Sequence, residues 1–168
     1  VENVNPKIES LQIPTIADEG EKVKFNSNIF DPGKNDNFTL KWIIDTKDTV
    51  TTVKKSIEYT FPDNGNISIE LIAIDKDSGA DTIKQFIQVN NREPSAEIKS
   101  KRKAIEGDLV QFEAFVVDPG IDDTHSYEWM LGDGTIKKEK NFKHAYRDNG
   151  TYVIQLIATD DDGGKSNI

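Results

Sequence analysis

The chain has 168 residues, of which 35% are hydrophobic and 30% charged, and its formal net charge is -9. This acidic balance argues against nucleic-acid binding, because proteins of that class present a basic face to the phosphates. Cysteine is absent, which excludes disulfides, thiol catalysis and thiolate metal sites. No run of the sequence approaches the roughly 18 apolar residues that a membrane span needs, so we expect no membrane insertion by this segment.

Alternation of apolar and polar residues, interrupted by Gly, Pro, Asn and Asp, predicts strands and no helices. Many short strands with frequent turn signals are typical of an all-β sandwich. In the first half we expect strands near residues 7–13, 21–30, 38–45, 56–61, 66–75 and 80–89. In the second half we expect them near residues 95–100, 108–117, 125–131, 142–146, 151–160 and, incompletely, 165–168.

An internal repeat is the strongest signal in the sequence. Paired residues lie 87 positions apart up to the tryptophans and 85 positions apart beyond them. This change of offset places a length difference in the loop after the tryptophan strand, where insertions are tolerated. The pairs are Glu19-Gly20 with Glu106-Gly107, Phe25 with Phe112, Asp31-Pro32-Gly33 with Asp118-Pro119-Gly120, Trp42 with Trp129, Asp63-Asn64-Gly65 with Asp148-Asn149-Gly150, Leu71-Ile72-Ala73 with Leu156-Ile157-Ala158, and Asp75 with Asp160.

The two repeats meet at Asn90-Asn91-Arg92-Glu93-Pro94. Pro94 restricts the residue before it to extended geometry, so we expect a short, stiff linker between domains of residues 1–90 and 91–168. The second repeat stops early: Gly79 precedes a full final strand, whereas only four residues follow Gly164. We therefore predict two tandem β-sandwiches, the second lacking most of its last strand and leaving an open sheet edge. We also expect the natural chain to continue beyond Ile168.

The centre of the second repeat is the stretch Tyr127-Glu128-Trp129-Met130-Leu131-Gly132-Asp133-Gly134-Thr135. Its alternation predicts one inward face, and its glycines stop the strand because they accept positive φ. We predict that Trp42 and Trp129 are core residues of their sandwiches. The stretch is not a phosphate loop, because it has neither a Gly-Lys-Ser/Thr ending nor three spaced glycines that open a helix.

The second repeat resembles the polycystin-type (PKD) domain, which has an immunoglobulin-like fold. The resemblance rests on Trp129 to Thr135, His144-Ala145-Tyr146, Gly150-Thr151-Tyr152-Val153, Asp160 and Gly163, and it departs from the family at Met130, where Asp is usual. The first repeat is degenerate, since Trp42-Ile43-Ile44-Asp45-Thr46-Lys47 lacks the Gly-Asp-Gly turn, Tyr59-Thr60-Phe61 replaces His-x-Tyr, and Ile67 replaces Tyr152. The resemblance implies two immunoglobulin-like sandwiches, with Tyr152 in a tyrosine-corner arrangement.

The resemblance also implies calcium sites. Some bacterial members bind calcium through an early Asn, the Asp after the second strand and the Asp that closes the penultimate strand. The matching positions are Asn5, Asp31 and Asp75 in the first repeat and Asn91, Asp118 and Asp160 in the second. Asn90 is an equally available match, and Asp77 and Asp162 lie in loops at the same end. Plain turn chemistry remains the alternative, because Asp-Pro-Gly is a good turn without a metal.

Little in the sequence supports catalysis. His125 and His144 are the only histidines, and their spacing matches no zinc motif. We expect His144 at a framework position of the family and His125 at the surface. Without cysteine or a Gly-x-Ser-x-Gly elbow, a nucleophile and its base have almost nothing to be built from, so we expect no enzyme activity.

Proteins that carry PKD-type domains are mostly secreted or on the cell surface. We therefore expect a non-catalytic spacer and interaction module that holds the flanking domains of a larger parent chain. One alternative is an accessory module of a secreted hydrolase, which would bind a protein or polysaccharide and would need a row of exposed aromatics; the sequence offers only Phe38, Phe86 and Phe115. Another is homotypic adhesion or a surface lattice. Sequons that fit glycosylation are Asn37-Phe38-Thr39, Asn66-Ile67-Ser68 and Asn149-Gly150-Thr151.

Overall fold

A computed structural model describes residues 3–32 and 37–166. Throughout these ranges the regular secondary structure is strand, so the all-β prediction is confirmed. The chain divides into two compact units, Val1–Asn90 and Asn91–Ile168. Over the part of the chain that the structure describes, no helix is long and apolar enough to cross a membrane.

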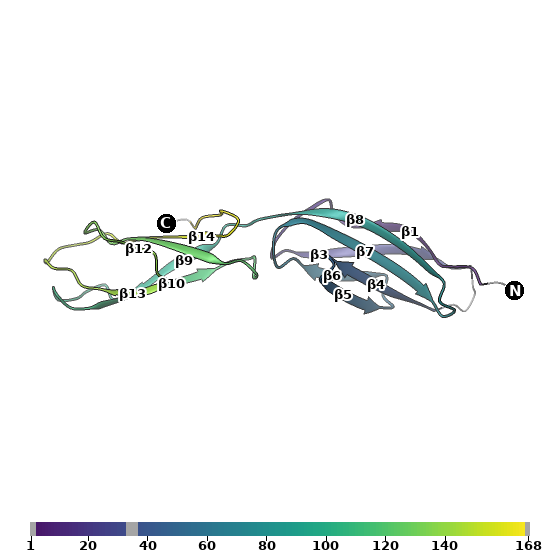
Figure 1. Ribbon diagram of the computed structural model, residues 1–168, viewed down its shortest axis with the longest axis horizontal. Helices are drawn as coiled ribbons and strands as arrows, with labels where there is room; N and C mark the ends of the chain where they lie inside the picture. The colour runs from purple at the N-terminus through teal and green to yellow at the C-terminus, as the bar shows by residue number, and fades with distance from the viewer. Residues whose placement is uncertain (1–2, 33–36, 167–168) are drawn as a thin grey trace. The chain divides into compact units, whose positions relative to one another are not determined.

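The first unit is a sandwich of a five-stranded and a three-stranded sheet (Figure 1). The larger sheet has the order β2-β8-β7-β4-β5, and the smaller has the order β1-β3-β6. Both sheets are antiparallel except that β2 runs parallel to β8. The strands are β1 (Lys7–Gln12), β2 (Ile16–Asp18), β3 (Lys22–Phe30), β4 (Phe38–Ile44), β5 (Asp48–Thr52), β6 (Ser56–Thr60), β7 (Gly65–Asp75) and β8 (Ala80–Asn90).

The core of the first unit is built from the alternate, inward-facing residues of these strands. Trp42 is fully buried at its centre, and its ring centroid lies 6.1 Å from that of Phe25. In β7 the alternation predicts Ile67, Ile69, Leu71 and Ala73 on the inward face; the last three are fully buried, and Ile67 is half-buried. Alternation therefore identified the core face correctly, because a strand turns successive side chains to opposite faces.

The second unit has two three-stranded sheets, with the orders β13-β10-β9 and β12-β11-β14 (Figure 1). Trp129 is fully buried between them, as predicted, and its indole Nε1 donates to the Glu139 carbonyl oxygen at 3.0 Å. The rings of Phe112 and Phe142 each pack against the indole in an edge-to-face arrangement. The strands are β9 (Ser95–Ser100), β10 (Val110–Val117), β11 (His125–Met130), β12 (Ile136–Lys137), β13 (Asn141–His144) and β14 (Gln155–Asp160).

The structure departs from the predicted strands in a few places. The sequence did not predict β2, β5 and β12, which are short strands without a long run of alternating residues. The strand predicted at 151–160 begins only at Gln155, because its first residues lack the neighbour that β8 provides in the first unit. Of the strand predicted at 165–168, Lys165 makes a single bridge to Thr159, and residues 167–168 lie outside the described residues.

Candidate metal centre in the second unit

In the first unit Asp75 ends β7 and accepts hydrogen bonds inside the turn that leads to β8. Its Oδ1 accepts from the N–H groups of Asp77 and Gly79, both at 2.8 Å. Its Oδ2 accepts from the amide of Asn3 at 2.9 Å. Donation by Asn3 is the largest influence on the carboxyl group and, with the two backbone donors, holds the pKa of Asp75 below its usual value despite burial.

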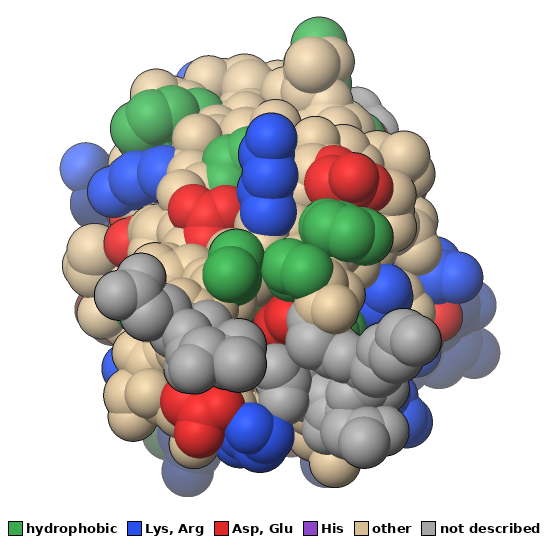
Figure 2. All heavy atoms as spheres, turned by 90° about the vertical axis from the view of Figure 1, so that its right-hand side faces the viewer, with side chains coloured by type: hydrophobic (Ala, Val, Ile, Leu, Met, Phe, Trp, Pro, Cys, Tyr) green, Lys and Arg blue, Asp and Glu red, His purple; other side chains and the backbone are tan. Residues whose placement is uncertain are grey.

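Asn5 lies beside the same turn. Its amide donates to the Ala80 carbonyl at 3.3 Å. A Cβ atom on Gly79 would lie 2.6 Å from Asn5 Oδ1 and 2.5 Å from Asp75 Oδ2, so only glycine fits between these two oxygens. Figure 2 views this end of the unit, where carboxylates and lysines share the face with a few hydrophobic side chains. Within residues 3–32 and 37–90, Asp31 is half-buried and belongs to no cluster of three metal-binding side chains.

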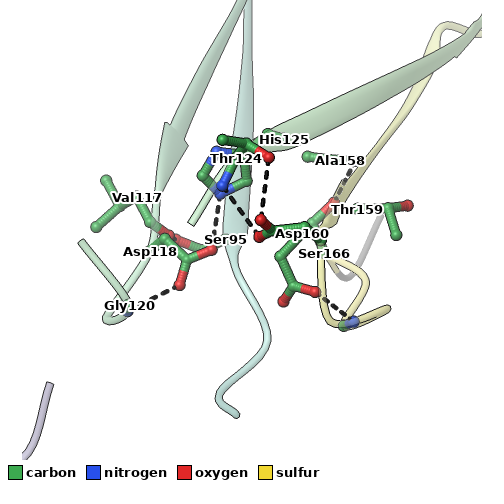
Figure 3. Close-up of polar contacts among 12 residues, drawn as sticks. Ser95, Val117, Asp118, Gly120, Thr124, His125, Ala158, Thr159, Asp160 and Ser166 are labelled. Atoms are coloured by element: carbon green, nitrogen blue, oxygen red, sulfur yellow. Dashed lines mark hydrogen bonds and ion pairs between the residues drawn. The ribbon is translucent and has the colours of Figure 1, made fainter. Parts of the chain in front are cut away.

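The second unit brings together three carboxylates. Oxygens of Asp118, Asp123 and Asp160 lie within 4.8 Å of one another. Asp118 follows β10, Asp123 belongs to the loop before β11, and Asp160 ends β14. The predicted pair Asp118 and Asp160 therefore does meet at one end of the sandwich. Figure 3 shows these two side chains on either side of His125.

Backbone and side-chain donors hold these carboxylates in place. Asp160 repeats the pattern of Asp75: its Oδ1 accepts from the N–H groups of Asp162 at 3.1 Å and Gly164 at 2.7 Å. The amide of Asn91 donates to Asp160 Oδ2 at 3.1 Å. Asp118 Oδ1 accepts from the Gly120 N–H at 3.1 Å (Figure 3). Turn chemistry thus orients the carboxylates of Asp118 and Asp160, as the alternative interpretation expected.

The chemistry of this cluster fits a hard cation. Each pair of carboxylates at this separation repels by roughly 3–4 kcal/mol at an effective dielectric constant of about 20. The side-chain oxygen of Asn91 is buried and has no hydrogen-bond partner among the described residues. A buried polar atom without a partner is costly, and a cation would satisfy it together with the carboxylates. Calcium takes such carboxylate and amide oxygens as ligands.

Three details differ from the sequence predictions. His125 was expected at the surface, but its side chain is only 17% exposed and its Nε2 lies 2.7 Å from Asp118 Oδ2. This prediction was wrong because the start of β11 is adjacent in space to the end of β10. Asn90, the other candidate for the early Asn, donates instead to Asp18 in the first unit. The partner of Asp75 that corresponds to Asn91 is Asn3, which the sequence analysis did not select.

Asp123 was not predicted either, although a signal for it existed. The residue 87 positions earlier is Asp36, so the aspartate belongs to the internal repeat. Asp36 lies outside the described residues. Asp162 does not join Asp118 and Asp160; it forms a second, more exposed set with Asp123 and Asp161. Donation from the Thr124 N–H is the largest cause that keeps the pKa of Asp161 below its usual value.

The Gly-Asp-Gly turn of the second unit is a structural element. Asp133 Oδ1 accepts from the Thr135 N–H at 2.9 Å, and its Oδ2 lies 2.7 Å from His144 Nε2. Tyr152 donates from its hydroxyl to the Asp148 carbonyl at 2.9 Å, which confirms the tyrosine-corner arrangement. Burial is the largest cause that raises the pKa of Tyr146 to about 12. These contacts support framework roles for the turn and its partners.

Comparison with known proteins gives a family and a relative of known name. The family model described as PKD domain matches residues 3–90 and again residues 91–168. Collagenase ColA from Clostridium perfringens is 34% identical over 74 residues, which make up 44% of this chain but only 7% of the collagenase. The matched segment thus spans a small part of that relative.

Solved structures with similar chains are more distant in sequence. One describes carbohydrate-binding modules of the β-sandwich superfamily; it is 15% identical, with 94% of this chain and 85% of that chain covered and a TM-score of 0.48. Another is the amphioxus IgVJ-C2 molecule, 13% identical, with 90% and 95% covered and a TM-score of 0.46.

Proposed function

Both halves of this chain belong to the PKD domain family, and from that premise we propose a non-catalytic spacer and interaction module of a larger extracellular protein. In this proposal the second unit binds calcium, and the ion stiffens the unit. The partners are the flanking domains of the parent chain. The module acts by holding those domains apart and not by chemistry of its own.

The observation that carries this proposal is the carboxylate cluster with the buried oxygen of Asn91. Asn91 is the first residue of the second unit, and the cluster connects it to the loop after β10 and to the end of β14. Calcium supplies a multivalent positive charge that holds such oxygens together. Asp118, Asp123, Asp160 and Asn91 would hold the ion, and His125 orients the Asp118 carboxylate.

Ion binding would fix the segment by which the chain enters the unit. A ligand that binds only the folded state stabilises it by about 2.7 kcal/mol at a hundredfold excess over its dissociation constant. Calcium sites of extracellular modules have dissociation constants of roughly 0.1–1 mM. Calcium at about 1 mM is therefore expected to stabilise the second unit by roughly 0.4–1.4 kcal/mol, which is measurable as a rise in melting temperature.

The test is calorimetric melting of the full chain in calcium and in a chelator, with the variants Asp123→Asn and Asp122→Asn. Asp123→Asn removes one carboxylate of the cluster, whereas Asp122 is exposed and belongs to neither acidic set. We expect calcium to raise the transition of the second unit in the parent chain and in Asp122→Asn, and the rise to shrink in Asp123→Asn. Equal melting of the parent chain with and without calcium would remove the metal from the proposal.

A second candidate function is an accessory module that helps a secreted hydrolase to hold a protein or polysaccharide substrate. The 34% identity with a collagenase favours this function. Phe86 and Phe115 are exposed, each beneath a lysine ammonium group, whereas Phe38 packs against the core. Co-sedimentation of the chain with insoluble collagen or cellulose tests it. Retention that falls in Phe86→Ala or Phe115→Ala supports the accessory function, and no retention on either material supports the spacer.

A further inference from the structure

The larger sheet of the first unit ends in a strand that has a single neighbour. In the order β2-β8-β7-β4-β5, β5 is the last strand and pairs only with β4 (Figure 1). Four of its five residues are exposed. The last strand of the unit, β8, pairs with β7 and β2 on the other side of the sheet, so it does not cover β5. Such an edge presents backbone N–H and C=O groups with which another strand can pair.

The pairing of β4 shows which backbone groups of β5 face this free edge. The N–H of Asp45, which follows β4, donates to a carbonyl of β7 at 2.8 Å. Backbone groups alternate between the two neighbours of a strand, so Trp42 directs its own groups to β5 and forms a hydrogen-bonded pair with Val50. The residues on either side of Val50, Thr49 and Thr51, therefore direct their N–H and C=O groups to the free edge. Among the described residues, no backbone hydrogen bond is made there.

β5 lacks the features that usually keep an edge strand from pairing. Those features are charged side chains, prolines, bulges and very short length. The other edge strands of the first unit have them: β2 has only three residues, β1 has a bulge between Ile8 and Ser10, and β6 carries Glu58. β5 contains no Lys or Pro, and its one charged residue, Asp48, stands at its first position and accepts a hydrogen bond from the Tyr59 hydroxyl.

The second unit protects the edge at the same position. There the strand next to the tryptophan strand is β12, which has only two residues. Lysines lie within it and directly after it, at Lys137, Lys138 and Lys140. The first unit has Thr49-Val50-Thr51-Thr52-Val53 in this connection, which are five consecutive β-branched residues without a charge. The internal repeat therefore contains a protected and an unprotected form of one edge.

We propose that β5 is an interaction edge through which two copies of this chain pair, antiparallel, about a twofold axis at Val50. Thr49 of each copy then forms a hydrogen-bonded pair with Thr51 of the other, and each pair exchanges both of its backbone bonds. The Val50 side chain lies on the same face of the sheet as Trp42 and meets Val50 of the other copy in the closer, non-hydrogen-bonded pair. This contact adds a partner to the proposed spacer and does not depend on calcium.

The partner is a second copy because β5 is complementary to itself in this register. Each hydrogen-bonded pair joins two threonines, a favourable cross-strand pair, and the central pair brings two exposed valines together. Asp48 lies opposite Thr52 of the other copy, so like charges do not face each other. A twofold contact uses the same surface on both copies, as this register does. The contact between two such short strands is small, so the pairing is weak and transient, and it strengthens where several copies are held side by side.

Disulfide cross-linking of the full chain tests the register, because the sequence contains no cysteine of its own. In Val50→Cys the two thiols of a pair face each other at a Cα separation of about 4.5 Å, which a disulfide accepts. Val53→Cys is the matched control: Val53 is 72% exposed and Val50 only 36%, but Val53 lies opposite Lys47 of the other copy. With a mild oxidant we expect the covalent dimer to form several-fold faster in Val50→Cys. Equal rates, or a faster reaction of Val53→Cys, would overturn the proposal.

NMR of the full chain between micromolar and millimolar concentration tests the backbone pairing. The amides of Thr49 and Thr51 are expected to shift and to exchange more slowly as the concentration rises, whereas the Val50 amide, already bonded to β4, changes little. Thr51→Pro removes an outward N–H without removing a bond to β4 and is expected to abolish these changes, and Thr51→Val keeps the N–H and behaves like the parent. If Thr51→Pro unfolds the first unit, Thr49→Lys/Thr51→Lys replaces it, because lysines then face each other across the edge. Amide shifts confined to the second unit, or unaltered by these variants, contradict the pairing.

Discussion

The two units have the same plan and differ in how completely each is closed. In the first unit, β8 lies along β7 and two of its side chains complete the core. In the second unit, Ile98 and Ile154, the counterparts of the buried Leu11 and Ile69, are exposed and half-buried, respectively. The comparison shows that the tryptophan is fully buried in both units, and that β8 completes the remaining part of the core in the first.

The turn after the tryptophan strand differs as well. In the second unit Gly132 and Gly134 have φ values of 80° and 88°, in the region that glycine accepts without strain. In the first unit Asp45 and Thr46 have φ values of 49° and 61°. A β-branched residue in this region is strained. The first unit therefore makes a turn with positive φ values although neither of these two residues is glycine.

The largest expected effect tests whether each tryptophan supports only its own unit. Removing a buried Trp side chain costs about 3–5 kcal/mol, and the second unit has the smaller core from which to lose it. Trp129→Ala is expected to abolish the melting transition of the second unit and to leave that of the first. Trp42→Ala should do the reverse in the same calorimetric scan, and loss of both transitions in either variant would show that the units fold together.

The next effect is a difference between the units in how their stability changes at alkaline pH. The pKa of Tyr146 rises to about 12 in the folded state, so folding binds its proton more tightly than the unfolded chain does. Stability from this group is complete below about pH 10 and is lost as the pH rises toward 12, by about 1–2 kcal/mol. Phe61 occupies the matching position in the first unit and cannot titrate. Urea unfolding at pH 9 and 11 should show the loss in the parent chain and a smaller loss in Tyr146→Phe.

The strained turn of the first unit predicts a gain in stability. Lys47 N–H donates to the Ile44 carbonyl across Asp45 and Thr46, so these two are the central residues of a tight hairpin turn. Such turns prefer glycine at the second central position. Thr46→Gly is expected to stabilise the first unit by about 1 kcal/mol. The same change at Thr135, which follows the relaxed turn of the second unit, serves as the control and should bring no gain.

The smallest expected effect concerns the stability of the second unit at acidic pH. Burial alone would raise the pKa of Asp133, but hydrogen bonds from Thr135 and His144 lower it below 3.8. A depressed folded pKa contributes stability above the unfolded value, and this contribution disappears as the pH falls through the folded value. Asp133→Asn should therefore reduce the acid sensitivity of the second unit below pH 4 by less than about 1 kcal/mol. If the acid unfolding of the second unit is the same in this variant as in the parent chain, the assignment is contradicted.

From the sequence alone, the strand class, the repeat and the buried tryptophans were predictable, because alternation and turn residues act between neighbours in the chain. For this reason Trp42, Trp129 and three of the four inward residues of β7 are buried as predicted, whereas the fourth, Ile67, is only half-buried. Oxygens of Asp118 and Asp160, the pair that the family resemblance implied, also lie close together.

Only the tertiary structure decided which loops lie next to one another. It places Asp123 close to Asp118 and Asp160, and His125 beside Asp118. It also shows that Asn3 is the side chain that donates to Asp75. It also showed that residues 151–154 do not form a strand, although their sequence alternates as well as that of β7. Local pattern gives a segment the capacity to be a strand, but a strand forms only where a neighbour from a distant part of the chain accepts its backbone hydrogen bonds.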